Sequence, residues 1–541
     1  MGGFVGRLGE EDPATTRRMA RMLDARGPAA RWERHADATS FIVVASGSPA
    51  LDEAIGASEG VVAAVEGHVP NRKALAAEQD LGDDAPIGEV VARLIARTGF
   101  ARAFARLPGD VALAAWQPAL GNGWLARDRA GVRPLAWAPV SGGIAFATEA
   151  RALHAAGFAG PPSARALATT VGLGCALESA YEGSQTLAAG EILSVRATET
   201  RTERSAWPSA HPPGAAGNFE RWSRSVRYGL DLAYSVGGRA ALPHAIALSG
   251  GLASAALLAV RPRDAAPALA LTLVAGGRRD ADVGALAASA GLPLREVVFD
   301  ASVLDQLADE VAPHPAWVQP EAWAWAALAQ AAWREGLVGL VAGIGARVGF
   351  DPPAPRPLLA LRSRLRQALG ADAVGLEALA RSLGPWLPGD DAALEALSRR
   401  LDGVAPAVRR AGLGRGLRLP EVELAALDAG CAAFGVHAVV PFADPALLAV
   451  ACEVPVGAHH YRARRALLAS VAAAPPREPL DWSLDVPTLI RAFALDTLPE
   501  RLRDRLDAEH VRSVVAAALA GDERCARRVF ALEMVARGLV G

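Results

Sequence analysis

Lysine is almost absent from this sequence, because Lys73 is its only one and nearly every basic residue is arginine. A mechanism that needs a lysine elsewhere in the chain is therefore excluded. Cysteine is also rare: the four residues, Cys175, Cys431, Cys452 and Cys525, are scattered without the spacing of metal ligands. This pattern argues against a thiolate metal site and predicts reduced, buried thiols in a cytoplasmic protein.

The chain also lacks a charge excess and a long apolar run. Its formal net charge is −2 with 21% charged residues, so no basic field predicts binding to nucleic acid or to a membrane surface. The longest apolar stretch, residues 244–260, is interrupted by Ser249-Gly250-Gly251, and acidic residues at 10–12 break the N-terminal segment. We therefore expect no spanning helix, no secretory signal and a cytoplasmic protein whose partners are small molecules or peptides.

A length of 541 residues favours two domains. In the first, predicted for residues 1–205, short β-prone runs alternate with turns, and Asn122-Gly123 and Ser141-Gly142-Gly143 have the composition of hairpin turns. The β-prone runs are residues 40–45, 61–65, 111–116 and 144–147. This pattern predicts a layered α+β domain.

A segment rich in proline, glycine and alanine, residues 206–220, is typical of a linker. Beyond it, the second predicted domain covers residues 221–541. Apolar runs at 245–248, 268–273 and 337–342 are separated by helical stretches such as 283–290 and 322–334. This alternation predicts an α/β fold with a doubly wound parallel sheet, and the remainder from about residue 356 is predicted to be helical.

The strongest local motif follows the first of these apolar runs, where a buried strand is expected to turn into a helix. Such a turn presents backbone N–H groups and the positive helix end to an anion. On its own, the motif fits an ordinary tight turn equally well. The candidate cofactor-binding residues of the turn are Leu248, Ser249, Gly250, Gly251 and Ser254.

This turn resembles the SGGxDS signature of the asparagine synthetase family, class B, the glutamine-hydrolysing type. Further segments resemble family motifs in the same order. Residues 107–116, 125–135 and 146–149 resemble LxGxFAFALWD, LARDRxGxKPLYY and FASE, and residues 336–350 and 441–444 resemble GxxVxLxSGEGADELF and PFLD. The resemblance implies an N-terminal Ntn-hydrolase-like layered domain and a C-terminal ATP-pyrophosphatase domain of the adenine nucleotide α-hydrolase-like type. In that family ATP adenylates a carboxylate, and an amine then displaces AMP.

The ligase motifs lack their acidic side chains. Ala253 stands at the aspartate position of the SGGxDS motif, and Ile344, Arg347 and Val348 stand at the acidic positions of the second motif. Because Mg²⁺ prefers carboxylate and phosphate oxygens, these substitutions argue against a Mg²⁺ site, while ATP remains an expected ligand. Gly343 and Arg347 are further candidate cofactor-binding residues. Arg347 could bind a triphosphate directly or be an ordinary solvated residue.

The catalytic lysine of the family falls near residues 477–479, where this chain has none. Arg464 or Arg465 could reach the site from another direction, although an arginine is a poor proton shuttle.

The amidotransferase motifs have changed in a similar way. Gly2 stands where the family has its nucleophilic cysteine, Glu66 where it has the oxyanion-hole asparagine, and His68 where it has a glutamine-binding glutamate. A carboxylate repels a developing oxyanion, so we expect no glutaminase activity. Catalytic residues therefore stay unassigned, because family positions 2, 66, 253 and 347 are all substituted. Residues 127–129 are expected to form buried or interfacial ion pairs.

Two functional hypotheses remain open. The first is an ATP-dependent, amide-bond-forming ligase homologue, altered or impaired, acting on a peptide or small carboxylate. Lasso peptide macrolactam synthetases and β-lactam synthetases also lack the cysteine, because their amine comes from the substrate. The lasso type fits this alanine- and arginine-rich chain better, and it implies peptide-maturation partner proteins. The second is a non-catalytic pseudoenzyme that binds a peptide or a partner synthetase.

Overall fold

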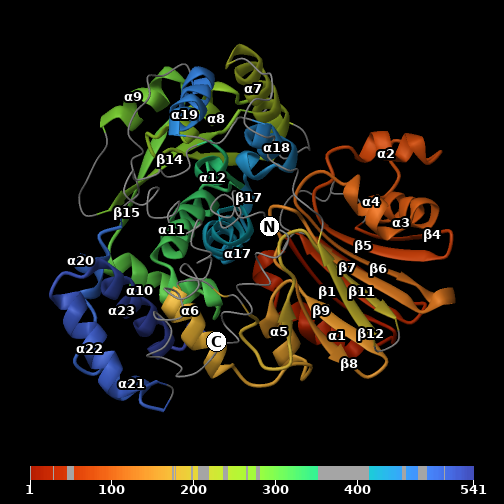
Figure 1. The fold of residues 1–541 in the computed structure, drawn as a ribbon, viewed down its shortest axis with the longest axis horizontal. Coiled ribbons are helices and arrows are strands. Elements are labelled where there is room, and N and C mark those ends of the chain that lie inside the picture. The colour runs from red at the N-terminus through yellow and green to blue at the C-terminus, as the bar shows by residue number, and fades with distance from the viewer. Residues whose placement is uncertain are drawn as a thin grey trace, which may run out of the picture.

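The computed structural model describes most of the chain in two adjoining parts, one rich in antiparallel strands and one built on a parallel sheet (Figure 1). The described residues are 2–27, 30–45, 54–173, 176, 178–196, 199–204, 219–235, 242–262, 266–275, 281–350, 414–453, 458–472, 484–504 and 506–540. The predicted fold class is confirmed: a layered α+β part, an α/β part and a helical C-terminal portion. None of the described helices is long and apolar enough to cross a bilayer.

The first part stacks two six-stranded antiparallel sheets face to face. One has the order β10-β8-β9-β1-β3-β2, made of Gln185–Thr186, Ala136–Val140, Gly143–Ala147, Gly2–Leu8, Thr39–Ala45 and Ala30–Ala36. The other has the order β12-β11-β7-β6-β5-β4, made of Glu199–Arg204, Glu191–Arg196, Asn122–Arg127, Val111–Gln117, Val61–Gly67 and Ile55–Ser58. The inner faces share one apolar core, in which Phe4 and Phe146 lie with ring centroids 5.0 Å apart.

Helices cover the outer faces of this sandwich. The first sheet is covered by α1 (Pro13–Arg21) and α5 (Ala150–Ala155), and the second by α2 (Arg72–Glu78), α3 (Ile87–Thr98) and α4 (Phe100–Ala105). The strands of the first sheet are therefore buried on both faces, which explains why apolar residues follow one another along β3 without alternating with polar ones. A further helix, α6 (Ala164–Leu173), contacts α23 (Glu523–Ala536).

The predicted strands of this part are confirmed by β3, β5, β6 and β9, and the predicted Ser141-Gly142 turn joins β8 to β9. The prediction of a turn at Asn122-Gly123 was wrong. These two residues lie inside β7, paired with Gln117 and Trp116, and the chain reverses earlier over residues 118–121. Gly121 adopts φ +59 there and supplies the left-handed residue that the turn requires, so Asn122 and Gly123 can remain extended.

The second part contains a five-stranded parallel sheet of order β15-β14-β13-β16-β17. Its strands are Leu294–Phe299, Leu269–Ala275, His244–Ala247, Gly339–Val341 and His437–Val439. From β13 the chain runs outward to β14 and β15, then returns past β13 to form β16 and β17 on the other side. The strand order thus reverses between β13 and β16, and crevices at such switch points are the usual ligand sites of parallel sheets.

Helices pack on both faces of this sheet, as the alternating pattern predicts. One face is covered by α10 (Ala301–Glu310), α11 (Pro320–Arg334) and α17 (Ala425–Ala432). The other is covered by α7 (Phe219–Ser235), α8 (Leu252–Ala259), α9 (Ala281–Ser289), α18 (Pro445–Glu453) and α19 (Ala458–Ala472). Side chains alternate accordingly along β13: Ala245 and Ala247 face the first set, whereas Ile246 faces the second.

Beyond residue 413 the described part is mostly helical, with β17 as a short strand. Besides α17, α18 and α19 it contains a π-helical turn, Gly414–Leu424, and α20 (Val486–Ile490), α21 (Leu498–Leu502), α22 (Ala508–Leu519) and α23 (Glu523–Ala536), whereas α12 (Ala346–Gly349) comes earlier. Of the predicted linker 206–220, residues 206–218 lie outside the described residues, and α7 begins at Phe219. Residues 351–413 also lie outside them.

Candidate functional site

The position expected to carry the amidotransferase nucleophile has no room for a side chain. Gly2 begins β1 at the centre of the first sheet, between β3 and β9. A Cβ atom built on Gly2 would lie 2.7 Å from the carbonyl oxygen of Val44 and 3.2 Å from Oε1 of Glu66. The loss of the cysteine is therefore accompanied by steric closure of the place that a thiol would occupy.

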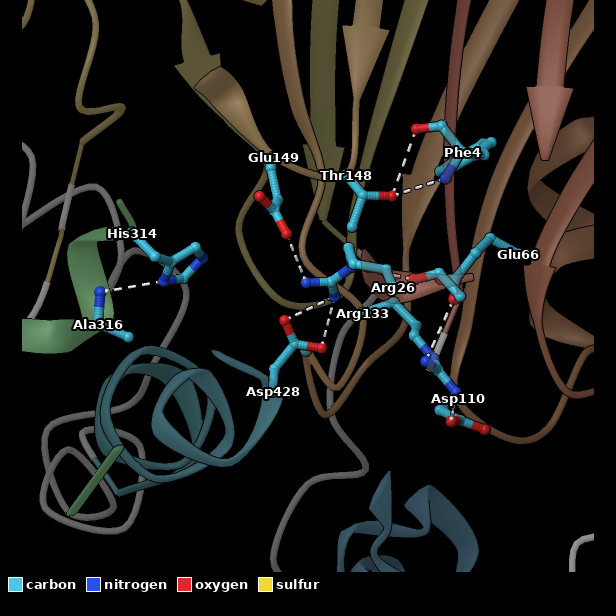
Figure 2. A network of polar contacts seen from close by, with 12 residues as sticks. Phe4, Arg26, Glu66, Asp110, Arg133, Thr148, Glu149, His314, Ala316 and Asp428 are labelled. Atoms are coloured by element: carbon cyan, nitrogen blue, oxygen red, sulfur yellow. Dashed lines mark hydrogen bonds and ion pairs between the residues drawn. The ribbon is translucent and has the colours of Figure 1, made fainter. Parts of the chain in front are cut away.

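Glu66, at the expected oxyanion-hole position, belongs to a buried ion cluster. It is 2% exposed, and its Oε1 lies 3.1 Å from Nη1 of Arg133. Nη2 of Arg133 donates a hydrogen bond of 2.6 Å to Asp110 (Figure 2). One buried guanidinium thus holds two carboxylates together, and no amide donor is present at position 66 to stabilise an oxyanion.

Beside this cluster, Arg26 connects the two parts of the molecule. Its Nε donates to the carbonyl oxygen of Gly2 at 3.1 Å, and its Nη1 donates to Glu149 at 2.8 Å. Nη2 reaches both carboxylate oxygens of Asp428 on α17, at 2.8 and 2.7 Å (Figure 2). Only 1% of Arg26 is exposed, so these bonds are shielded from water and from salt. This contact could not be predicted from the sequence, because no local pattern links Arg26 to Asp428, which lies 402 positions away.

The ionisation of the Arg26 cluster follows from burial and from its partners. Burial opposes the charge of Arg26, but Asp428 and Glu149 raise its pKa above the ordinary value. Burial also opposes the charge of Glu149, yet Arg26 and Arg151 outweigh it and hold the pKa of Glu149 below its usual range. Burial raises the pKa of Asp428, and Arg26 works against that shift.

A second ion pair crosses between the parts at Arg127, near the pair formed by Arg26. Its Nη1 lies 3.2 Å from Oε1 of Glu421, and its other N–H groups donate to the carbonyl oxygens of Gly131, Arg133 and Leu187. The expectation of a buried interfacial ion pair is confirmed for Arg127. Asp128 instead accepts hydrogen bonds from the backbone N–H groups of residues 132 and 133, so it shapes the turn after β7.

Restoring a cysteine should not restore glutaminase activity. We expect Gly2→Cys, alone or with Glu66→Asn, to release glutamate from glutamine no faster than the unaltered protein, because the Cβ would meet the Val44 carbonyl. Overpacking of this kind typically costs about 1–3 kcal/mol, so both variants should also melt at a lower temperature. Glutamate release and thermal unfolding check the two effects. Turnover above the unaltered protein by Gly2→Cys would show that position 2 is open.

The second candidate site lies at the carboxyl end of β13. The strand ends beside the fully buried Leu248, and Gly250, at φ +73, allows the sharp turn into α8. The hydroxyl of Ser254 donates to the carbonyl oxygen of Gly251 at 3.0 Å and accepts from the N–H of Ser249 at 3.4 Å. Because the helix N-cap is Gly251, no side chain caps the first N–H groups of α8. These groups are suited to bind an anion.

The segments with family resemblance in this half meet at the same place. A Cβ atom on Gly343, after β16, would lie 3.0 Å from Cβ of Ala253 in α8. Two residues later, Gly345 adopts φ +94, and a Cβ there would lie 2.9 Å from the backbone of Phe442. The turn after β13, the loop after β16 and the segment after β17 therefore converge at the switch point of the sheet.

A cavity of about 420 Å³ opens in front of these loops. Of the predicted residues, Ser249, Gly251, Ala253, Ser254, Gly343 and Arg347 line it, whereas Leu248 and Gly250 do not. Charged residues that sequence reasoning did not place here also line it: Glu321, Arg418, Glu423, Glu523 and Arg527. They come from α11, α23 and the π-helical turn, and no local motif marks them. Arg465 lines the cavity as well, while the side chain of Arg464 and residues 477–479 lie outside the described part.

The donor set of this cavity does not fit Mg²⁺. Ala253 and Arg347 contribute no ligand oxygen, and Arg347 adds a positive charge. The Glu321 carboxylate lies 2.7 Å from Arg527, and that of Glu423 lies 2.8 Å from Arg418, so two of the three glutamates already have a cation. Within the described ranges, no group of three or more histidines, cysteines, aspartates or glutamates is placed to hold a metal ion.

Gln319 stands between this cavity and a smaller one at the junction of the two parts. The smaller cavity measures about 100 Å³ and includes Glu149, His314 and Asp428 in its lining. Gln319, 4% exposed, lines both cavities and donates to the carbonyl oxygen of Glu421 at 3.4 Å. Burial lowers the pKa of His314, whose Nδ1 accepts from the backbone N–H of residue 316 (Figure 2).

Comparisons with known proteins support the N-terminal resemblance. No curated protein matches this chain in sequence. Among matching solved structures, the glutamine phosphoribosylpyrophosphate amidotransferase from B. subtilis complexed with ADP and GMP is 14% identical, with 72% of this chain and 94% of that chain covered and a TM-score of 0.28. A structure described as the allosteric regulatory enzyme of purine biosynthesis is 13% identical, with 72% and 93% covered and a TM-score of 0.28. TM-scores this low do not show that the whole chain shares the fold of these proteins. Residues 1–207, however, match the family described as glutamine amidotransferase domain, and this part of the chain is therefore amidotransferase-like.

Proposed function

We propose that this chain is an asparagine synthetase-like, ATP-dependent homologue of amide-bond-forming ligases that does not hydrolyse glutamine. Its substrate would be a carboxylate whose amine partner lies in the same molecule, as in a peptide macrolactam synthetase of the lasso type. The observation that carries this proposal is the convergence of the glycine turn after β13 and the Gly343 loop after β16 on one cavity. The closed position at Gly2 supports it, because ammonia from glutamine would then not be the nitrogen source.

The chemistry available to the described residues is binding and charge stabilisation. The N–H groups at the start of α8 and the surrounding guanidinium groups would hold the phosphates of ATP. A carboxylate placed beside the α-phosphate could then attack it, with pyrophosphate as the leaving group. The arginines of the cavity are poor proton shuttles, so a glutamate carboxylate of its lining would have to accept the proton of the substrate amine. We place the protein in the cytoplasm, where ATP is available and the free thiols of Cys431 and Cys525 would stay reduced.

Exchange of labelled pyrophosphate into ATP tests this proposal, with candidate precursor peptides and small carboxylates as substrates. We expect exchange that depends on one substrate class and falls at least tenfold in Gly343→Val, whose side chain would press on Ala253. Gly284→Val is the matched control, since a Cβ at that position in α9 meets nothing within 4 Å. Exchange no higher than without protein for every substrate, with both variants folded, would refute the ligase proposal.

The alternative is a non-catalytic protein that uses the same scaffold to bind a peptide or a partner synthetase. Ala253 and Arg347 favour it, because metal-assisted departure of pyrophosphate would have neither protein carboxylate. This alternative predicts that a peptide or a partner binds, as measured by calorimetry, while no exchange occurs. The two experiments together distinguish the hypotheses.

A further inference from the structure

We propose that His314 makes the contact between the two parts of the molecule sensitive to acid, because protonation of its imidazole weakens the junction that Arg26 and Asp428 form. This sensitivity is independent of the function proposed above, since it concerns only the junction. His314 is partly buried and lines the cavity of about 100 Å³ between the two parts. Its ring points towards Arg26, Glu149 and Asp428 (Figure 2).

In its neutral form, His314 caps the 3-10 turn η3 (Pro315–Val318). Its Nδ1 accepts a hydrogen bond of 3.1 Å from the backbone N–H of Ala316, so the ring proton lies on Nε2. A second proton would have to go to Nδ1, where it would face that N–H group. Protonation therefore removes the cap and repels the ring from the turn.

The charges around the ring are balanced without an imidazolium. Asp428 binds Arg26 through both carboxylate oxygens, at 2.8 and 2.7 Å. Oε1 of Glu149 accepts from Arg26 at 2.8 Å, and its Oε2 accepts from Arg151. Each carboxylate oxygen thus already has a guanidinium donor. A positive charge on His314 would be buried without a partner of its own, which is unfavourable.

Few other ionisable groups line the same cavity. Helices α6, α11 and α23 pack against η3 but contribute no ionisable side chain to the described lining. Arg127 and Glu421 pair with each other at 3.2 Å, and the remaining ionisable residues of the lining are Glu178 and Tyr181. The charge balance at the ring therefore depends on the Arg26 cluster.

The turn that His314 caps is joined to the helix that carries Asp428. Trp317 and Val318 of η3 are each 2% exposed, belong to the same apolar core as α17, and η3 packs directly on that helix. Displacement of the ring from the turn would therefore shift α17 relative to Arg26. The cavity beside the ring is large enough to admit water as the contact loosens.

The direction of the pH effect identifies His314. Burial lowers its pKa, and the charges of the Arg26 cluster do not reverse this shift. The unfolded chain therefore takes up the proton first, so this stability is present above the ordinary histidine pKa of about 6.5 and is lost as the pH falls below it. Burial raises the pKa of Asp428, so its titration would change stability in the opposite direction. The pKa of Glu149 is lowered, so this carboxyl titrates only at more acid pH.

Chemical unfolding of the full chain at several pH values tests this switch. Between about pH 7.5 and 5.5, the unfolding equilibrium constant of the unaltered protein should rise about three- to tenfold more than that of His314→Asn, tenfold being the limit for one histidine that is protonated only when unfolded. Asparagine keeps an acceptor at the cap and does not titrate. His154→Asn, which removes an exposed histidine of α5, should keep the pH dependence of the unaltered protein.

Hydrogen exchange locates the effect at the junction. At about pH 5.5, the amides of α17 should exchange at least about threefold faster in the unaltered protein than in His314→Asn, and at about pH 8 the two proteins should agree. If His314→Asn does not fold, exchange of α17 relative to α3 in the unaltered protein gives the same comparison across pH. The proposal is overturned by equal pH dependence in His314→Asn and the unaltered protein, by an equal loss of it in His154→Asn, or by α17 exchange that does not accelerate in acid relative to α3.

Discussion

Replacing Asp428 with alanine is expected to destabilise the protein by about 3–5 kcal/mol, the usual effect of removing one partner of a buried ion pair. Asp428 binds Arg26 through both carboxylate oxygens, and Arg26 is 1% exposed. Without Asp428 the guanidinium would keep only Glu149 and the Gly2 carbonyl oxygen, in a place that water does not reach. Chemical unfolding measures the loss of stability, monitored with one spectroscopic signal from each part of the chain.

The control for this prediction is Asp504→Ala, whose carboxylate is exposed and 3.8 Å from its arginine. We expect its unfolding midpoint to match that of the unaltered protein. The double variant Arg26→Met with Asp428→Leu should recover most of the stability, because no charge is then left buried at this contact. If Asp428→Ala unfolds like the control, the contact between the two parts contributes no stability and its geometry is wrong.

Replacing Arg133 with methionine is expected to have an effect of similar size, about 3–5 kcal/mol. Arg133 holds Glu66 at 3.1 Å and Asp110 at 2.6 Å, and all three residues are buried. Its removal would leave two buried carboxylates facing each other without the guanidinium that bridges them. Thermal and chemical unfolding measure the effect, and Arg503→Met, a largely exposed arginine, is the matched control.

A rescue experiment shows whether the Arg133 effect is electrostatic. Adding Glu66→Gln and Asp110→Asn to Arg133→Met removes both carboxylate charges, and we expect this triple variant to regain at least half of the lost stability. A triple variant as unstable as Arg133→Met would assign the effect to lost packing of the arginine side chain instead.

Local patterns predicted much of this fold because local chemistry determines it. The apolar runs of β3, β5 and β13 are strands since both faces of their sheets are covered. The glycine turn before α8 was predictable because a left-handed residue at Gly250 is needed to enter a helix from a strand. Asn122-Gly123 shows the limit of such inference: Gly121, one residue earlier, already supplied the left-handed conformation.

The candidate residues could be named from the sequence, but the residues that surround them in the structure could not. The substitutions at Gly2, Ala253 and Arg347 are evident from the sequence alone. The residues that surround these positions come from distant segments of the chain. Asp428 binds Arg26 near Gly2, and Glu321 and Glu423 line the cavity in front of α8. The sequence predicted two loop motifs without their acidic side chains, whereas the structure brings glutamates from other segments to the same cavity, two of them paired with arginine. Pairing of that kind depends on tertiary packing and leaves no periodic signal.

The bidentate contact between Arg26 and Asp428 of α17 also gives the amidotransferase-like half a structural role. If the chain were cut after Arg204, Arg26 would keep only Glu149 as its ionic partner in one fragment, and Asp428 would lose its arginine in the other. In each fragment, a charged group that is buried in the intact fold would be exposed to water. The contact therefore couples the stability of the C-terminal half to that of its neighbour, whether or not that neighbour performs any reaction.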